Sequence, residues 1–287
     1  NYTPPDMVAK VTGAAKYAED FRADGMLFTK LLLSPMPHAR VRNIDTSAAL
    51  AMPGVHAVLR EADCPHPGSA MLGENVVIND EQNITPEMIL TDEPHFQGQP
   101  ILAVAAESEL LAAEAIERIV LDLEPLPFMI DPVEALRPGS PNPRAEGNVW
   151  IGNHVEEIKW TDEDFREIDA GQLPFRETPE TWEVGDVDAA FEAADLIVDH
   201  TVVLGSNSHE PLESRSAMAY WQNGKVYLHS STQSIVMVHG IMAAFIGVTP
   251  DEVVLIGEYC GGGFGSKYAG TPPSAIPALL SKKTNRP

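Results

Sequence analysis

Apolar and polar positions along the first 137 residues predict strands and helices in turn. Four short apolar runs have the length of buried strands: 26–33, 55–59, 100–106 and 120–123. Between the last two runs, Ser108 is a favoured N-cap, and the apolar residues that follow it as far as Val120 fall on one face of a helix. An Ala-rich segment, 45–52, ends at a Pro-Gly pair that stops it. The pattern indicates an α/β domain.

This periodicity is lost in residues 138–180. Several prolines and glycines come first, and an acidic stretch follows from Glu156 to Asp169. Segments of this composition are typical of links between domains, because they offer too few apolar residues to form a core of their own. We expect a connector here, with its order supplied by a partner.

An α/β pattern returns from residue 181 onward. The predicted elements are a helix capped by Asp186 and running to Ala194, strands at 196–204, 225–229 and 253–256, a helix at 234–246 followed by Gly247, and a helix capped by Ser274 and running to Lys283. Gly247 stands where helices commonly end in a left-handed residue. The strand at 253–256 leads into a glycine-rich segment, Gly261–Lys267.

The charge of the chain argues against two classes of partner. Its 287 residues include 19 Lys and Arg against 42 Asp and Glu, so the formal net charge is −23. Such a field repels nucleic acid and anionic membranes, so we expect neither as a partner. A single pocket can still be locally basic, which leaves room for an anionic cofactor. The sequence has no apolar run of about 20 residues and no signal-peptide pattern, so we expect a cytoplasmic protein.

Cysteine usage argues against several kinds of site in this chain. Cys64 and Cys260 are its two cysteines, far apart and each without a CxxC partner. This argues against a disulfide framework, a thiolate zinc site and an iron–sulfur cluster. We expect Cys64, with the Pro-His-Pro that follows it, to lie in a surface loop. Cys260 is expected to be a small buried residue beside the glycine-rich segment.

The glycine-rich segment is the one candidate for anion binding that the residues themselves suggest. Glycines after a strand let backbone N–H groups approach an anionic ligand and allow positive φ. A dinucleotide fingerprint is missing, because Ser266 stands where its third glycine belongs. A P-loop is missing too, since Lys267 precedes Tyr268 rather than Ser or Thr. From the loop alone, an ordinary turn and a phosphate cradle stay equally open.

The segment His209–Glu213 has a superficial likeness to a zinc-protease motif. Its His and Glu are four residues apart, which would place both on one face of a helix. Pro211 lies between them and disfavours a helix, and the second His of that motif is absent. We therefore favour a structural role for this segment. The sequence also contains no GxSxG elbow.

Several stretches, taken in order, resemble the large subunit of molybdenum hydroxylases, the family of xanthine dehydrogenase, aldehyde oxidoreductase and carbon monoxide dehydrogenase. They are KVTGAAKYAED at 10–20, SPMPHAR at 34–40, ID at 44–45, PGV at 53–55, GQPILAVAA at 98–106, GDVDAAF at 185–191, HEPLE at 209–213, STQ at 231–233 and GGGFG at 261–265. Each stretch is short, but their order across nearly the whole chain makes the resemblance specific.

The resemblance implies a mixed α/β (α+β) fold made of two family domains and a link. Residues 1–137 would form an α/β hammerhead domain, and residues 138–180 would be the connector. Residues 181–287 would be the first, incomplete part of a molybdopterin-binding domain.

The resemblance also implies an oxidoreductase that works as part of a complex. In this family the large subunit holds molybdenum through molybdopterin or molybdopterin cytosine dinucleotide and hydroxylates a carbon with oxygen from water. Electrons then pass to [2Fe-2S] and FAD in partner subunits. The family's catalytic Glu falls beyond these 287 residues, so we expect a second molybdenum-domain chain or a C-terminal half to complete the site, and no activity from this chain alone. The alternative is a non-catalytic assembly or scaffold protein that keeps the fold.

Two parts of the sequence match the family's cofactor contacts. Gln233 corresponds to a glutamine whose side-chain amide donates to a molybdenum oxo group. Gly262, Gly263, Phe264 and Gly265 correspond to a loop whose backbone contacts the cofactor. Amide and backbone donors suit oxo ligands and the charge that develops on them. No residue is expected to bind the metal directly, since the pterin holds it.

Glu213 and Tyr268 add to the prediction of the site and of its substrate. Glu213 is expected to be structural and to cap backbone groups near the loop. Purine-oxidising members of the family carry a Glu directly after the lysine of the loop, and Tyr268 occupies that position here. We therefore expect an aromatic, heterocyclic or aldehyde substrate rather than xanthine.

Overall fold

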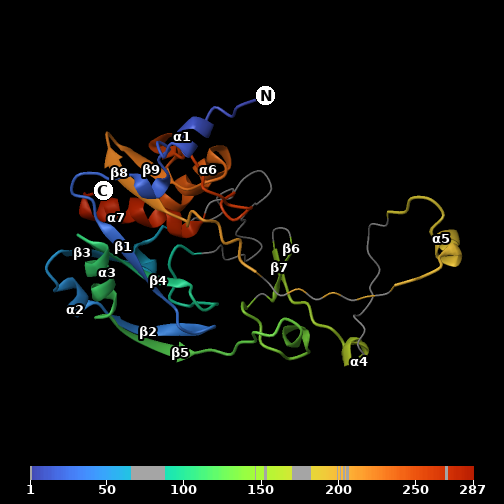
Figure 1. Ribbon diagram of the computed structural model, residues 1–287. Coiled ribbons are helices and arrows are strands. Elements are labelled where there is room, and N and C mark those ends of the chain that lie inside the picture. The colour runs from blue at the N-terminus through green and yellow to red at the C-terminus, as the bar shows by residue number, and fades with distance from the viewer. Residues whose placement is uncertain are drawn as a thin grey trace. The chain divides into compact units, whose positions relative to one another are not determined.

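The computed structural model describes residues 2–65, 88–145, 147–151, 154–169, 182–198, 200, 202, 204, 207–268 and 271–287. The chain forms two compact units. The larger contains Asn1–Phe128, Asn142–Glu157 and His209–Pro287, and the smaller contains Met129–Pro141 and Ile158–Ser208. Helices and strands alternate along much of the chain, which confirms the mixed α/β class (Figure 1).

The centre of the first sheet is β4 (Pro100–Ala106). Its antiparallel neighbours are β1 (Phe28–Leu33) on one side and β3 (Val55–Arg60) on the other (Figure 1). The sequence PILAVAA is apolar at every position, and residues 101–106 are completely buried. A strand that is apolar on both faces requires a core on each side of the sheet.

Two cores meet at this strand. Ala103 and Ala105 belong to a cluster that also contains Leu228 of the second sheet. Leu102 and Val104 belong to a different cluster, formed with residues of the preceding strands and of the helix that follows β4. Successive residues of a strand point to opposite faces, so one strand takes part in both cores. The first core therefore joins segments on both sides of the predicted connector.

The second sheet carries the candidate site. It consists of β8 (Ala217–Gln222), β9 (Lys225–Ser230) and β10 (Val253–Ile256). β9 lies in the middle, antiparallel to β8 and parallel to β10. Helix α6 (Ile235–Ile246) connects the two parallel strands, and α7 (Ile276–Thr284) contacts β8. The carboxyl ends of β9 and β10 consequently lie side by side.

The remaining elements are smaller. The strand pairs are β2 (Ala39–Asp45) with β5 (Val120–Pro125), and β6 (Val149–Ile151) with β7 (His154–Glu156). The helices are α1 (Met7–Val11), α2 (Ser47–Leu50), α3 (Glu109–Ile116), α4 (Asp162–Asp169) and α5 (Val187–Ala193). Short 3-10 helices are η1 (Ala18–Asp20), η2 (Glu61–Asp63), η4 (Glu134–Leu136), η5 (Pro250–Glu252) and η6 (Pro272–Ala275).

Two predicted N-caps, Ser108 and Asp186, are confirmed by their hydrogen bonds. Each side chain accepts from the backbone N–H three residues ahead, at the start of α3 and α5, and Ser234 caps α6 in the same way. Gly247 ends α6 with φ 75°, as its position predicted. The predicted cap at Ser274 is wrong. That residue lies inside η6, its hydroxyl pairs with Thr271, and α7 begins at Ile276 after Ala275.

Other predictions need correction. The described residues of 196–204 form no strand, although their apolar pattern suggested one. Within the predicted connector, β6, β7 and α4 are ordered elements, so the described part of 138–180 is more structured than its composition indicated. Residues 170–180 of the connector lie outside the described residues. The domain ranges 1–137, 138–180 and 181–287 stay predictions, since the two packing units do not follow them.

Among the described residues, no helix has both the length and the apolar character needed to cross a membrane.

Candidate functional site

The loop after β10 has an unusual backbone. Gly262 has φ 105°, Phe264 φ 53° and Gly265 φ 103°. Glycine takes up positive φ without steric cost, but at Phe264 the left-handed conformation costs about 1–2 kcal/mol. A strained residue of this kind persists only where the surrounding contacts hold it. Phe264 is also 73% exposed, so burial of its ring does not explain the conformation.

Gln233 holds this loop from the end of β9. Its Oε1 accepts from the backbone N–H of Gly265 at 2.9 Å and from that of Lys267 at 3.2 Å. Its own backbone N–H donates to the carbonyl of Lys267 at 3.0 Å. Two backbone donors can be satisfied only by the amide oxygen, so they fix which end of the side chain is the oxygen. The Nε2 amino group therefore stays a donor on an exposed side chain.

A buried ion pair lies beneath the same loop. Lys267 Nζ donates to Glu213 Oε2 at 2.9 Å and to the Glu213 carbonyl at 2.7 Å, and the two side chains are 1% and 9% exposed. Glu213 Oε2 also accepts from the Gly261 N–H at 2.7 Å, which confirms the predicted structural role of Glu213. Its other oxygen, Oε1, is buried and has no hydrogen-bond partner among the described residues. The pair fixes both ends of the loop.

Two of the glycines are required by close contact. A Cβ added at Gly263 would lie 2.2 Å from Gln233 Oε1, and one added at Gly261 would lie 2.6 Å from Glu213 Cβ. Neither distance is possible without a shift of the loop or of the side chain that it contacts. The glycine-rich sequence thus serves to bring the loop backbone against Gln233 and Glu213.

This packing leaves a row of backbone donors unused. Within the part of the chain that the structure describes, the N–H groups of Gly262, Gly263 and Phe264 donate to no other residue. Successive free N–H groups near left-handed residues form a concave anion site. Together with Gln233 Nε2, they offer a set of neutral donors that suits oxo or phosphate oxygens. Of the two alternatives that the loop sequence left open, the geometry favours the anion cradle.

Two segments that the sequence analysis judged to be structural, His209–Glu213 and the one around Cys64, form no functional site among the described residues. The described segment around Pro211 forms no helix, so His209 and Glu213 do not share a helix face. Cys64 packs against the first core, and burial, aided by the charges of Asp63 and Glu61, raises the pKa of its thiol to about 12. A thiol with that pKa stays protonated at neutral pH and is a poor metal ligand. His66 and Pro67, which follow Cys64, lie outside the described residues.

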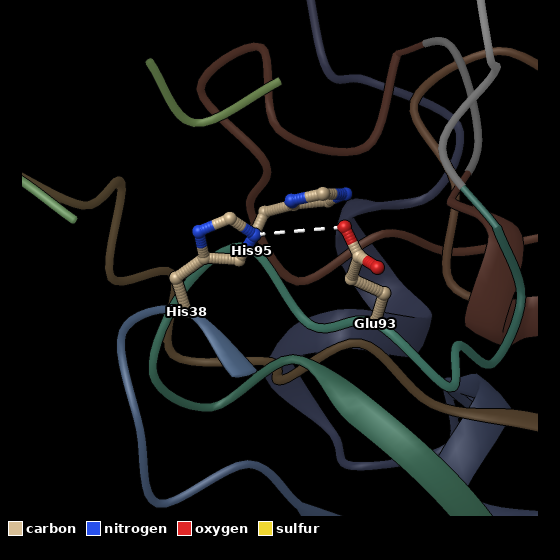
Figure 2. Close-up of side chains that lie close together, drawn as sticks. All are labelled: His38, Glu93 and His95. Carbon is tan, nitrogen blue, oxygen red and sulfur yellow. Dashed lines mark ion pairs between the residues drawn. The ribbon is translucent and has the colours of Figure 1, made fainter. Parts of the chain in front are cut away.

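A second cluster of chemically capable side chains was missed at the sequence level. His38, Glu93 and His95 lie together in the larger unit (Figure 2). His38 entered the sequence argument only as part of the SPMPHAR stretch. The spacing of Glu93 and His95, two residues apart around a proline, was a signal that could have drawn attention to them. Their approach to His38 depends on the fold.

Comparison with protein families identifies the chain. The model for the molybdopterin cofactor-binding domain matches residues 172–287, which include Gln233 and the glycine-rich loop. The model for the α/β hammerhead domain of aldehyde oxidase and xanthine dehydrogenase matches residues 12–127. The chain belongs to the molybdenum hydroxylase family. The predicted hammerhead fold followed by the start of a molybdopterin-binding domain is thereby confirmed.

Individual members of the molybdenum hydroxylase family align over nearly the whole chain. It is 31% identical to the aldehyde oxidoreductase of Megalodesulfovibrio gigas over 298 residues, covering 100% of this chain and 29% of that protein. It is 30% identical to the nicotine 6-hydroxylase large subunit of Paenarthrobacter nicotinovorans, covering 96% of this chain and 31% of that one. The solved aldehyde oxidoreductase from Desulfovibrio gigas superposes with a TM-score of 0.71 at 27% identity, covering 98% of this chain and 29% of that chain. The 287 residues thus span less than a third of these relatives' length.

Proposed function

We propose that this chain forms one wall of the molybdenum-cofactor site of an oxidoreductase complex. The observation that carries the proposal is the orientation of Gln233, whose oxygen is held by the Gly265 and Lys267 N–H groups so that Nε2 faces outward as a donor. When bound, the cofactor supplies the redox chemistry by which the family hydroxylates a carbon with oxygen from water. What this chain adds is a fixed set of donors.

The role of each residue follows from its hydrogen bonds. Gln233 Nε2 and the N–H groups of Gly262, Gly263 and Phe264 would donate to oxygen atoms of the molybdenum centre. Gly265 uses its N–H on Gln233, so it contributes the turn rather than a donor. Donors that are held in place before the reaction need no reorganisation as negative charge develops nearby. The unpartnered Glu213 Oε1 can accept one further hydrogen bond.

The rest of the site lies beyond these residues. The proposal places no catalytic residue here and assigns proton transfer to a Glu in a second molybdenum-domain chain or in a C-terminal half. The cofactor would be molybdopterin or its cytosine dinucleotide, with [2Fe-2S] and FAD in partner subunits of a cytoplasmic complex. Tyr268, 51% exposed next to the loop, favours an aromatic, heterocyclic or aldehyde substrate over xanthine.

The test uses the native complex purified with this chain from cells that make the molybdenum cofactor. Gln233→Glu keeps an oxygen acceptor for the loop N–H groups but removes the Nε2 donor and adds negative charge. We expect wild type to contain stoichiometric molybdenum, and the variant to lose molybdenum or to turn over about 10²–10³-fold more slowly. The matched control is Gln222→Glu, which makes the same charge change at an exposed residue at the end of β8.

Each outcome has a definite meaning. Molybdenum in wild type and in Gln222→Glu, with the loss confined to Gln233→Glu, supports the proposal. A folded wild-type complex without molybdenum would instead favour the non-catalytic scaffold. Unchanged molybdenum content and turnover in Gln233→Glu would remove the assigned role of Gln233.

A further inference from the structure

We propose that His38, Glu93 and His95 form a binding site for a divalent transition-metal ion such as Zn²⁺. The site is separate from the glycine-rich loop and does not depend on the function proposed for that loop. It lies within the larger unit, where the start of β2 meets the segment that precedes β4.

The three side chains converge (Figure 2). One ligand atom from each residue can be chosen so that all three lie within 4.8 Å of one another. His38 Nε2 is 3.7 Å from Glu93 Oε1. Zn²⁺ binds imidazole nitrogen at about 2.0–2.1 Å, so two ligand atoms of a tetrahedral site are about 3.3 Å apart. Side-chain rotations that move the ligand atoms by about 1 Å would bring them to the separations of a tetrahedral site.

The His38 imidazole is arranged as a metal ligand is. His38 Nδ1 is 2.8 Å from the carbonyl oxygen of Pro127, which fixes the proton on Nδ1 and leaves Nε2 with a lone pair. A ligating histidine usually donates its other N–H to a carbonyl or carboxylate in this way. His38 therefore presents Nε2 to Glu93 Oε1, 3.7 Å away.

In the described part of the chain, one nitrogen in each imidazole ring of the cluster is buried without a hydrogen-bond partner. His38 Nε2 and His95 Nδ1 are buried and have no hydrogen-bond partner among the described residues. A buried acceptor without a partner is destabilising, and buried polar atoms in native proteins are nearly always satisfied. The two rings contact each other with centroids 5.2 Å apart, but that contact satisfies neither nitrogen. A metal ion would satisfy both.

Glu93 is oriented by Arg40. Arg40 Nε and Nη2 both donate to Glu93 Oε2, at 2.9 and 2.8 Å, and this leaves Oε1 toward His38. A carboxylate ligand that is itself hydrogen-bonded is the usual arrangement in protein metal sites. The donor set of two imidazole nitrogens and one carboxylate oxygen suits Zn²⁺, Co²⁺ and Ni²⁺, whereas Ca²⁺ and Mg²⁺ prefer oxygen ligands alone.

The site would tie together parts of the chain that are far apart in sequence. His38 is 55 residues from Glu93, and the carbonyl that orients the His38 ring belongs to Pro127. An ion held by all three side chains would anchor the segment before β4 to the start of β2. Because such an ion binds only the folded state, its binding would also stabilise that state.

The experiment uses the full-length protein, stripped of loosely held metal by dialysis against a chelator. Zn²⁺ alone is then titrated, and Co²⁺ is used as a second probe because its visible absorption reports the ligands. We expect wild type to bind one equivalent of Zn²⁺ in addition to any molybdenum. His95→Gln and Glu93→Gln should weaken Zn²⁺ binding at least about tenfold. The cobalt spectrum should show nitrogen and oxygen ligation without a thiolate band, since the cluster contains no cysteine.

The matched control is His56→Gln. His56 Nε2 also lies near a carboxylate, 3.0 Å from Glu107 Oε1, but its other neighbour is Arg286 and no second imidazole is present among the described residues there. This variant should bind Zn²⁺ as wild type does. Wild type that binds no Zn²⁺ at a several-fold molar excess would overturn the proposal, as would equal binding by wild type and His95→Gln. The wild-type titration needs no variant to fold, so the test holds even if one variant does not.

Discussion

Two glutamates in the larger unit are each held by a basic side chain, and the pairs differ in burial. Glu213 and Lys267 are 9% and 1% exposed, and together they bind two backbone groups, the Gly261 N–H and the Glu213 carbonyl. Glu93 and Arg40 are 38% and 55% exposed, and they bind only each other's side chains and the neighbouring histidine. Water competes for the second pair and is excluded from the first.

The difference shows how the same pair of charges can serve two purposes. In a buried pair neither partner can be released without leaving an unpaired charge, so the pair locks the backbone that it binds. In a half-exposed pair the free energy of the contact is small, and one carboxylate oxygen stays available for another ligand. Burial alone would raise the pKa of Glu93, but the hydrogen bonds from Arg40 and the positive charges around it lower the pKa instead. Glu93 therefore stays ionised.

The largest effect is expected from breaking the buried pair. Lys267→Met leaves Glu213 buried without its cation, which should lower the free energy of unfolding by about 3–5 kcal/mol. Chemical denaturation of the purified protein measures this. Adding Glu213→Gln removes the unpaired charge while keeping an oxygen for the Gly261 N–H, so the double variant should recover part of the loss. A loss below about 1 kcal/mol in Lys267→Met would mean that the pair does not lock the loop.

The next effect tests the close approach of the loop to Gln233. Gly263→Ala places a Cβ 2.2 Å from Gln233 Oε1, so the loop or the Gln233 side chain that holds it must move, at a cost of about 1–3 kcal/mol. The control is Gly240→Ala in α6, where an added Cβ meets nothing within 4 Å and φ is not positive. That change should stabilise the protein by about 0.5–1 kcal/mol, because alanine favours a helix. Equal thermal midpoints for the two variants would contradict the described packing.

A smaller effect concerns pH and the strand that leads to Gln233. Burial lowers the pKa of His229 on β9, although the charge of Glu258 partly opposes this. At acid pH the unfolded chain therefore binds more protons than the folded chain. The stability of the folded state with neutral His229 is complete above about pH 6.5 and is lost as pH falls below that value. The loss is at most about 1.4 kcal/mol per pH unit.

Replacing His229 with Phe should reduce this dependence, because Phe keeps the ring contact with Phe21, now 4.0 Å between centroids, and cannot be protonated. The measurement is the difference in unfolding free energy between about pH 7.5 and pH 5.5, for wild type and variant. A dependence equally steep in both proteins would assign the acid sensitivity to other groups.

The smallest effect is expected at the exposed pair. Arg40→Gln removes the cation beside Glu93 and should change the free energy of unfolding by less than about 1 kcal/mol in metal-free protein. Comparison with Lys267→Met under the same conditions tests the contrast between the two pairs directly. Similar losses for both changes would show that exposure is not what separates them.

Local signals in the sequence were sufficient for much of the fold. The strands at 100–106 and 253–256 are apolar at nearly every position, and their predicted limits agree with the structure. Helix α6 was predicted over 234–246 with Gly247 after its end, and the structure shows that Ser234 and Gly247 cap it through backbone groups within a few positions of themselves. By contrast, β2 and β8 were not predicted. β2 has four exposed polar or charged residues, and as an edge strand it depends on pairing with a distant segment.

For the candidate sites, too, some features could be predicted from the sequence and others depend on the tertiary structure. The sequence by itself determined the family, the two matched domains and the presence of a glycine-rich loop after a strand, since each depends on residues that are close together along the chain. Only the tertiary structure decided that Glu213 pairs with Lys267, 54 positions away, and which end of the Gln233 amide faces outward. It alone brought His38 to Glu93 and His95 and set the tautomer of His38 through the distant carbonyl of Pro127. Hydrogen bonds and ion pairs act over a few ångströms in space, and the order of residues along the chain does not state which of them will come that close.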